Sequence, residues 1–394
     1  MDRTPRLLIA LAGLDAHLPG TLEQTLRDLD PATWAALLPL ARAEGLAAMI
    51  AAHLDQSGHA TLVPPAVCDA LRRERRTTLI NYTIHTVALD QIGAALRAAP
   101  IPFRVLKGLA IAQAVYPIPT TRAISDLDLW VPPAHLARAA ALLQELGYAP
   151  VPSQLPAAFV RTFAKEIVFV PQGASAPPAL VDLHWHPTAP WWMRATLRIP
   201  EQELFARPYP VQIGRHEYQT LDPTASLYYL GLHAGIGHRF QGLRWLIDIA
   251  LLAGAGQVEW PRLNRLVTAS GTGAILWRCL DLLDQTTGSR YAAHLARPPR
   301  RGHRALLRRL LPATLSVDLS IFDPEQELRV PLEQLILLPH PLAMAAALTR
   351  LLWPPAQWIR LRYAPLPAGG VPRARLAHLA RLRHLAPRRP RPAT

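Results

Sequence analysis

Two aspartates, Asp126 and Asp128, stand two residues apart in the run RAISDLDLWV (residues 122–131), about twenty residues after a short apolar segment that ends at Leu106. In a β-strand, residues two apart face the same side, so both carboxylates can converge on one divalent cation while Leu127 and Leu129 face the core. This spacing indicates phosphate and metal chemistry, and it suits a nucleotide bound with magnesium.

A third acid, Asp182, lies in the apolar run LVDLHWH (180–186), 54 residues after Asp128. Two Mg²⁺ ions held by carboxylates can catalyse phosphoryl and nucleotidyl transfer. Two carboxylates rarely suffice to hold both ions. If the strand of Asp182 lies beside the strand of Asp126 and Asp128, three carboxylates meet at one edge of a sheet. Asp182 could then bind the second ion and help to orient or deprotonate an acceptor hydroxyl.

A glycine, Gly108, stands where the first apolar segment gives way to a helix that begins at Leu109. Glycine lets the backbone approach a phosphate closely, and the first turn of a helix presents free N–H groups and the positive end of its dipole. Lys107 and Arg122 could add charge-assisted hydrogen bonds to a triphosphate. We therefore expect these three residues to bind phosphate.

Each of these residues also has a structural alternative. Asp126 could cap or end a strand, Asp128 could pair with Arg122, and Asp182 could form a structural ion pair. Lys107 and Arg122 could serve only as partners of the aspartates. Each signal is weak alone, but the order of the glycine turn, the two aspartates and the later acid favours the chemical interpretation.

Two pairs of histidines are candidates for the surroundings of the site. His184 and His186 share the strand face of Asp182, where an HxH pair could bind a transition metal, orient an acceptor or a carboxylate, or be satisfied by structural hydrogen bonds; the absence of a nearby thiolate disfavours zinc. His233 and His238 stand five apart, off the spacing of a shared α-helical site, so packing or hydrogen bonding is favoured over a substrate contact.

A third pair of polar residues lies further along the chain. Arg244 and Asp248 have the i, i+4 spacing of a helical ion pair, and we expect them to pair with each other.

The alternation of strand and helix patterns after residue 98 indicates an α/β unit. Pro133 is allowed in the first turn of a helix, and Gly147 is a helix-ending residue. The turn-rich residues 171–178 separate two strand candidates that could form a hairpin. The expected elements are strand 103–106, helix 109–116, strand 126–131, helix 133–147 and strands 159–170 and 180–186.

The rest of the chain has helical apolar spacing, with Asp222 or Thr224 as a helix cap. We expect an α+β or α/β core that contains a small mixed sheet and is flanked by helical regions. Its segments are a helical region over 1–98, the core over 99–220, a helical region over 221–363, and a linker with a basic tail over 364–394.

The composition is that of a globular protein: of 394 residues, 50% are hydrophobic and 18% charged, enough to bury a core and to exclude overall disorder. The net charge of +14 invites a nucleic-acid partner, but seven arginines lie in residues 371–394 and others cluster over 297–309. This distribution favours solvated basic faces over a nucleic acid, an acidic protein or an anionic membrane surface.

Two cysteines, Cys68 and Cys279, lie far apart in apolar helical contexts, which predicts reduced core residues of a cytoplasmic protein. Residues 334–349, an uncharged stretch that no other exceeds in length, contain two prolines and fall short of the roughly 20 apolar residues that a membrane-spanning helix needs. No membrane span is therefore expected.

The order of the glycine turn, the Asp-x-Asp strand and the later acid resembles the nucleotidyltransferase superfamily with the DNA polymerase β-like core, and most closely its uncharacterised nucleotidyltransferases. The similarity runs from about residue 30 to 365. The motifs that carry it are LKG (106–108), YP (116–117), Arg122 with DLD (126–128), VDLHW (181–185), and His233 followed by RWLID (244–248).

This resemblance implies that Gly108 is the phosphate-loop glycine, that Asp126 and Asp128 are metal ligands and that Asp182 is the third carboxylate. One departure is Leu109, because many active members of the superfamily have a second Gly or Ser at this position. Either Lys107 compensates for the missing Gly or Ser in binding the triphosphate, or the pocket binds a different phosphate donor.

The sequence therefore predicts a Mg²⁺- or Mn²⁺-dependent nucleotidyltransferase that moves a nucleoside monophosphate from a nucleoside triphosphate to an acceptor hydroxyl. The acceptor is a small molecule, a peptide or protein, or an RNA. Two other functions stay open: a kinase-like phosphotransferase on the same fold, and a non-catalytic nucleotide-binding or nucleic-acid-binding module that uses the basic C-terminal region. Three converging carboxylates favour the enzyme, because a pure binder does not need them.

Overall fold

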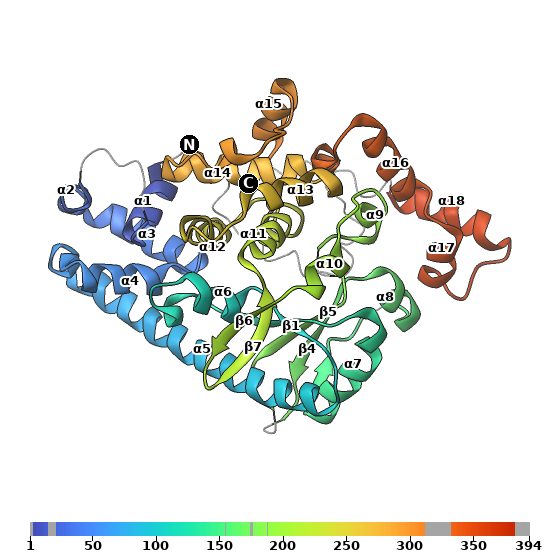
Figure 1. Cartoon of the computed structure of the whole chain (residues 1–394), viewed down its shortest axis with the longest axis horizontal. Coiled ribbons are helices and arrows are strands. Elements are labelled where there is room, and N and C mark those ends of the chain that lie inside the picture. Colours follow the sequence, from blue (N-terminus) through green and yellow to red (C-terminus); the bar gives the residue numbers. More distant parts are fainter. Residues whose placement is uncertain are drawn as a thin grey trace, which may run out of the picture.

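A five-stranded mixed sheet forms the centre of the protein in the computed structural model, which describes residues 3–14, 21–153, 155–173, 176–186, 188–311 and 332–382. The strand order is β1-β2-β5-β4-β3, and only β2 and β5 run parallel (Figure 1). This confirms the small mixed sheet. The strands are β1 (Arg104–Val105), β2 (Asp126–Trp130), β3 (Tyr148–Pro150), β4 (Glu166–Pro171) and β5 (Leu180–His184).

The register of β2 and β5 sets the two faces of the sheet. Asp128 lies opposite Asp182, and Leu129 lies opposite Leu183. Because side chains alternate along a strand, the acids share one face and the leucines share the other. The leucine face belongs to a core that also contains Ile92 of the 34-residue helix α5 (Pro65–Ala98) and residues of α6 (Gly108–Val115) and α7 (Leu136–Glu145).

A second core joins segments far apart in the sequence. Helices before the sheet and helices after it pack together above α5 and α6 (Figure 1). The earlier helices are α1 (Arg3–Leu11), α2 (Leu22–Arg27), α3 (Pro31–Ala43) and α4 (Ala47–Gln56). The later ones are α11 (Pro223–Leu232), the π-helix η4 (His233–Gly237), α12 (Leu243–Gly254), α13 (Trp260–Ser270) and α14 (Gly273–Thr287).

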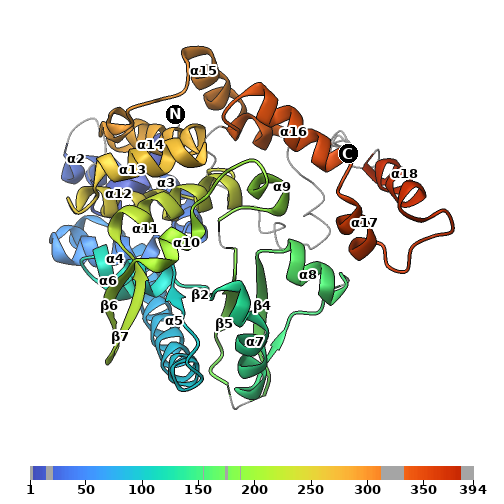
Figure 2. The same ribbon diagram turned by 45° about the vertical axis from the view of Figure 1, so that its right-hand side comes forward.

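The C-terminal helices form a third, smaller cluster against the core. α8 (Ala157–Phe163) lies beside α17 (Ala356–Arg362) (Figure 2). The ring of Phe159 in α8 lies 5.3 Å from the ring of Trp358 in α17, measured between centroids. α9 (Trp191–Arg194) and α18 (Gly370–Leu382) also contribute to this cluster. The buried hydrophobic residues of α10 (Glu201–Ala206), α15 (Arg301–Leu310) and α16 (Pro341–Leu352) belong to the second core instead. Residues 383–394 of the expected basic tail lie outside the described residues.

One local expectation is wrong, and one hairpin was missed. The strand expected over 159–170 is helix α8 followed by β4, because Phe159 turns into the aromatic cluster and strand pairing begins only at Glu166. A hairpin of β6 (Pro208–Ile213) and β7 (His216–Leu221) was not expected. Its prolines disguise the strand pattern, since proline is confined to strand edges. The hairpin adjoins β1, where Thr220 Oγ1 donates to the Val105 carbonyl oxygen at 2.7 Å.

Other expectations agree in outline. The helix expected over 133–147 opens with a 3-10 turn (Pro133–His135) and continues as α7. Cys68 and Cys279 are buried and form no disulfide. No single helix in the described ranges has the length and apolar character to cross a membrane, although the bent pair α3 and α4 passes that test by length and composition.

Candidate active site

A tight turn from β1 into α6 carries Lys107 and Gly108 to the acid-bearing face of the sheet. Lys107 has φ of 42° and Gly108 has φ of 27°, and a positive φ is rare for a residue with a side chain. A Cβ placed on Gly108 would meet its nearest atom, the Asp126 carbonyl oxygen, at 3.6 Å, so conformation rather than space favours glycine there. The strained Lys107 marks this turn as a candidate binding position.

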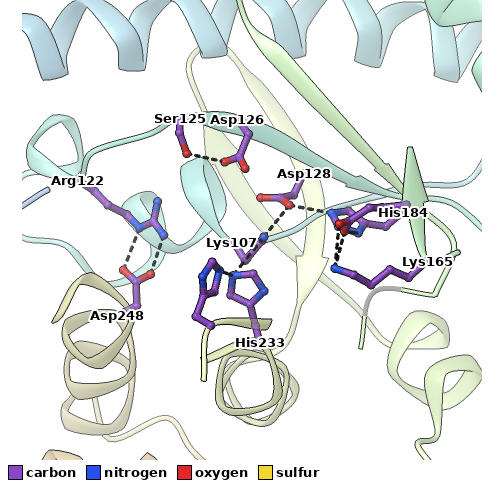
Figure 3. Close-up of polar contacts among 11 residues, drawn as sticks. Lys107, Arg122, Ser125, Asp126, Asp128, Lys165, His184, His233 and Asp248 are labelled. Carbon is purple, nitrogen blue, oxygen red and sulfur yellow. Dashed lines mark hydrogen bonds and ion pairs between the residues drawn. The ribbon is translucent and has the colours of Figure 1, made fainter. Parts of the chain in front are cut away.

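Asp128 is the centre of the polar cluster. Its Oδ1 lies 2.7 Å from Lys107 Nζ and 2.8 Å from His184 Nε2, and its side chain is 1% exposed (Figure 3). Burial alone would raise the pKa of Asp128, but Lys107 and His184 outweigh it and lower that pKa. Asp128 is therefore an ionised carboxylate held by two donors.

The other two predicted acids differ from Asp128 in their surroundings. Asp182 lies beside it in the sheet, and burial together with the charges of Asp128 and Asp126 raises the pKa of Asp182 to about 7. Asp126 is half-buried, and Ser125 Oγ donates to its Oδ1 at 3.1 Å. Burial and Asp128 also raise the pKa of Asp126. This high density of negative charge favours a cation as an additional partner.

Asp128, Asp182 and His184 offer ligand atoms that all lie within 4.8 Å of one another. This group fits a divalent metal ion, because carboxylates supply the charge and oxygen ligands that such an ion requires. Asp126 lies on the same strand face but does not belong to this group of three residues. Its role as a metal ligand stays a prediction.

His184 is engaged on both sides of its ring. Its Nδ1 lies 3.0 Å from Glu166 Oε2, opposite the Nε2 contact with Asp128. Burial would lower the pKa of His184, but Glu166 and Asp128 raise it to about 9. The protonated ring thus positions carboxylates, which was one of the interpretations of this histidine. His186 has a different partner: its Nδ1 lies 2.7 Å from Glu201 Oε2. The two histidines of the HxH pair therefore do not form one site.

Glu166 and its neighbour Lys165 were missed by the sequence interpretation. Lys165 Nζ lies 2.9 Å from Glu166 Oε1, on the side of the site opposite Arg122 (Figure 3). A signal was available, because Lys107 and Lys165 are the only lysines in a chain with 42 lysine and arginine residues. Both lysines contact carboxylates of this site.

His233 and His238 lie behind Lys107. Lys107 Nζ lies 3.5 Å from His233 Nε2, which is 3.0 Å from His238 Nε2. Burial and the Lys107 charge lower the pKa of His233 well below its usual range and that of His238 to about 3, so both rings are neutral. The hydrogen bonding expected for them is confirmed. Their spacing of five matches the π-helix, in which residue i+5 returns to the same side.

Arg122 does not pair with Asp128; it is clamped by Asp248 of α12. Its Nε and Nη2 donate to the two carboxylate oxygens at 2.9 and 2.6 Å, and the Tyr116 hydroxyl donates to Asp248 at 2.7 Å. The expected pairing of Arg244 with Asp248 is therefore wrong, since the carboxylate is taken by residues from another part of the chain. A Cβ on Gly108 would lie 4.0 Å from Arg122 Nη1, so the guanidinium still borders the glycine turn.

Residues 30–288 match the family described as uncharacterised nucleotidyltransferase. The chain belongs to this family. A search of curated proteins with this sequence found no match. The family supports a transferase that takes a nucleoside triphosphate as substrate, and a divalent metal is the general requirement of such enzymes.

In this nucleotidyltransferase the matched residues include every acid of the site together with the glycine turn and α12. The site lies between the sheet, which supplies Asp126, Asp128, Asp182 and His184, and the later helices, which supply His233 and Asp248 (Figure 3). Such an arrangement can hold a polyanion and a cation side by side, as group transfer from a nucleotide requires.

Proposed function

We propose that this protein is a Mg²⁺-dependent nucleotidyltransferase that transfers a nucleoside monophosphate from a nucleoside triphosphate to an acceptor hydroxyl and releases pyrophosphate. The observation that carries the proposal is the parallel register of β2 and β5, which sets Asp128 directly beside Asp182. The Lys107–Gly108 turn approaches the same face of the sheet, with Lys107 Nζ 2.7 Å from Asp128.

The phosphates would bind at the first turn of α6, where Gly108 allows close approach and the helix dipole favours negative charge. Arg122, fixed by Asp248, borders this turn and adds positive charge. Asp128 and Asp182, with Asp126, would hold Mg²⁺, which when bound neutralises charge on the attacking and leaving oxygens. The carboxylates, rather than the protonated ring of His184, are the suitable ligands for this hard cation.

Asp182 would orient the acceptor hydroxyl and accept its proton. A carboxylate within hydrogen-bonding reach of a nucleophile is a suitable general base, and Asp182, unlike Asp128, forms no ion pair in the described structure. His184, Glu166 and Lys165 form a chain of contacts that fixes Asp128. Their role in this proposal is to position the central carboxylate rather than to contact the substrate.

To test this, the protein is incubated with a cell extract, which supplies acceptors, and with ATP, GTP, CTP or UTP. Each nucleotide carries radioactive phosphorus in either the α or the γ position, and the label transferred to the acceptor is measured. Nucleotidyl transfer moves the α label to the acceptor and releases pyrophosphate, whereas a kinase moves the γ label and leaves a nucleoside diphosphate. We expect α-label transfer that requires Mg²⁺.

Asp128→Asn and Asp182→Asn should each reduce this transfer by at least about 100-fold, because they remove metal-binding charge while preserving shape. Asp69→Asn, on the surface of α5, is the matched control and should transfer normally. Full activity of Asp128→Asn, or transfer of the γ label instead, would overturn the proposal.

A further inference from the structure

Arg244 is a cation beside this site that forms no ion pair with any described residue. It lies in the first turn of α12, one turn before Asp248, whose carboxylate is taken by Arg122 and Tyr116. Among the described residues Arg244 has no hydrogen bond or ion pair, and its Nε is buried without a partner. Arg244 as a whole is half-buried, and a partly desolvated guanidinium without an ion-pair partner is costly, so an anion from outside the chain is its natural complement.

The side chain of Arg244 is held in one place. Its guanidinium lies 5.0 Å from the centre of the Trp245 ring. A Cβ placed on Gly45 would lie 3.4 Å from Arg244 Nε and 3.0 Å from Ala123 Cβ, and Gly45 itself has φ of 69°. Arg244 therefore packs across a glycine from Ala123, beside the segment that connects Arg122 to the Asp-x-Asp strand.

The residues around Arg244 leave its charge uncompensated. Burial and the neighbouring Arg122 guanidinium lower the pKa of Arg244, and Asp248 and Asp126 offset this only in part. The remaining neighbouring acid is Glu44, whose Oε2 accepts a hydrogen bond from the backbone N–H of Leu243 and whose pKa burial raises to about 7. Glu44 is thus at most a partial counter-ion near neutral pH.

The position of Arg244 indicates which part of a nucleotide it would contact. The Arg122–Asp248 pair lies on one side of Asp128, and His184 and Lys165 lie on the other (Figure 3). The reacting α-phosphate belongs at the carboxylates, and the acceptor belongs beside Asp182. Cations on the Arg122 side are therefore placed for the end of the triphosphate that leaves.

We propose that Arg244 binds the β- and γ-phosphates of the nucleoside triphosphate and stabilises the departing pyrophosphate. This inference rests on the proposed function. In the transfer, the acceptor oxygen bonds to the α-phosphorus, the bond from that phosphorus to the β-bridging oxygen breaks, and the hydroxyl proton passes to Asp182. The pyrophosphate leaves with the bonding electrons, and the guanidinium fork of Arg244 meets that charge.

Calorimetric titration with Mg²⁺ and three probes tests the proposal: the triphosphate among ATP, GTP, CTP and UTP that the wild type binds best, its monophosphate, and inorganic tripolyphosphate. Arg244→Ala should weaken binding of the triphosphate and of tripolyphosphate by roughly 10- to 100-fold and leave the monophosphate within about twofold. Arg244→Lys, which keeps the charge but loses the fork, should lie between. Arg138→Ala, an exposed arginine on α7, is the control and should match the wild type.

The outcomes separate the two proposals. If Asp128→Asn weakens triphosphate binding but Arg244→Ala does not, the phosphate-binding role of Arg244 is overturned and the proposed function stands. If the wild type binds tripolyphosphate through Arg244 but no nucleotide, the anion site stands and the proposed function falls. If the wild type binds neither polyphosphate, both are overturned.

A structural role for Arg244 is tested by thermal unfolding. Since this guanidinium has no hydrogen bond or ion pair among the described residues and only the Trp245 ring as a partner, Arg244→Ala should keep the melting temperature within a few degrees or raise it. A large decrease would show that Arg244 supports the fold, and the weaker binding would then have another cause.

Discussion

At the scale of single residues, Asp248 determines how the positive charges of the site are arranged. It fixes Arg122 in a buried bidentate pair, with side chains that are 3% and 0% exposed. Removing one partner of such a pair leaves the other charge uncompensated in the interior. The pair therefore couples the stability of the fold to the placement of a proposed phosphate-binding residue.

We expect Asp248→Asn to lower the free energy of unfolding by about 3–5 kcal/mol, measured by urea denaturation. Asp55→Asn is a matched control, because Asp55 pairs with Arg72 and Arg75 on the surface, where such contacts contribute under about 1 kcal/mol. Equal losses in the two variants would contradict the structural importance of the buried pair.

The sequence predicted that Asp128 and Asp182 lie on neighbouring strands near the glycine turn, but not all of the partners of these residues. Gly108, Asp128 and Asp182 could be identified because strand periodicity and a strand-to-helix glycine are local patterns. Arg244 was assigned to Asp248 by the local i, i+4 rule, whereas the carboxylate binds Arg122, 126 residues away. Such long-range pairing leaves no periodic trace in one sequence.

At the scale of elements, the start of α12 is held by a residue from the N-terminal helices. Glu44, which follows α3, is fully buried and accepts a hydrogen bond from the first N–H group of α12. A carboxyl group at this end also meets the positive end of the helix dipole. The contact places α12, and with it Arg244 and Asp248, against the sheet.

This contact predicts a pH dependence of stability. Burial raises the pKa of Glu44 from its ordinary 4.5 to about 7, so the protonated carboxyl is preferred in the folded state. Its stabilising contribution is complete below pH 4.5 and is lost as the pH rises through 7. Between pH 5 and 8, the wild type should lose about 2 to 3 kcal/mol more than Glu44→Gln.

Urea denaturation of both proteins across this range gives the measurement, and other titrating groups cancel because both proteins share them. The glutamine oxygen can still accept the Leu243 hydrogen bond, so the variant should fold. Parallel pH profiles for the two proteins would show that Glu44 titrates near its ordinary pKa in the folded state.

Elements were predictable where their pattern is regular. Strands β2 and β5 and helix α6 follow the apolar spacing, and the pairing of β4 with β5 was expected from the turn-rich segment between them. The π-helix at His233 was not, because a spacing of five residues carries no α-helical meaning. Proline-rich β6 and helix α8 also depart from local preferences, since tertiary contacts decide their conformations.

At the scale of the whole molecule, the transferase core is enclosed by helices from both ends of the sequence. The shared hydrophobic core contains Leu8 and Ile50 together with Leu246 and Leu280. Helical periodicity could indicate each of these helices, but not that the first and last of them pack together. The family match over residues 30–288 includes most of the helices of this core as well as the sheet.

The location of the positive charges, rather than the net charge of the molecule, indicates a polyanionic ligand at the site. The arginines of α15, such as Arg301 and Arg309, are exposed, whereas Lys107, Arg122 and Arg244 are gathered beside the buried acids. We therefore propose that this group of cations and carboxylates binds a nucleoside triphosphate together with a divalent metal.

The most direct test is calorimetric titration of the full-length protein with each nucleoside triphosphate, with and without Mg²⁺, alongside the double variant Asp126→Asn/Asp128→Asn. We predict binding of at least one triphosphate that requires Mg²⁺ and is lost in the variant while its thermal unfolding remains cooperative. Binding of equal strength in the wild type and the folded variant, or no binding to any triphosphate, would contradict the claim.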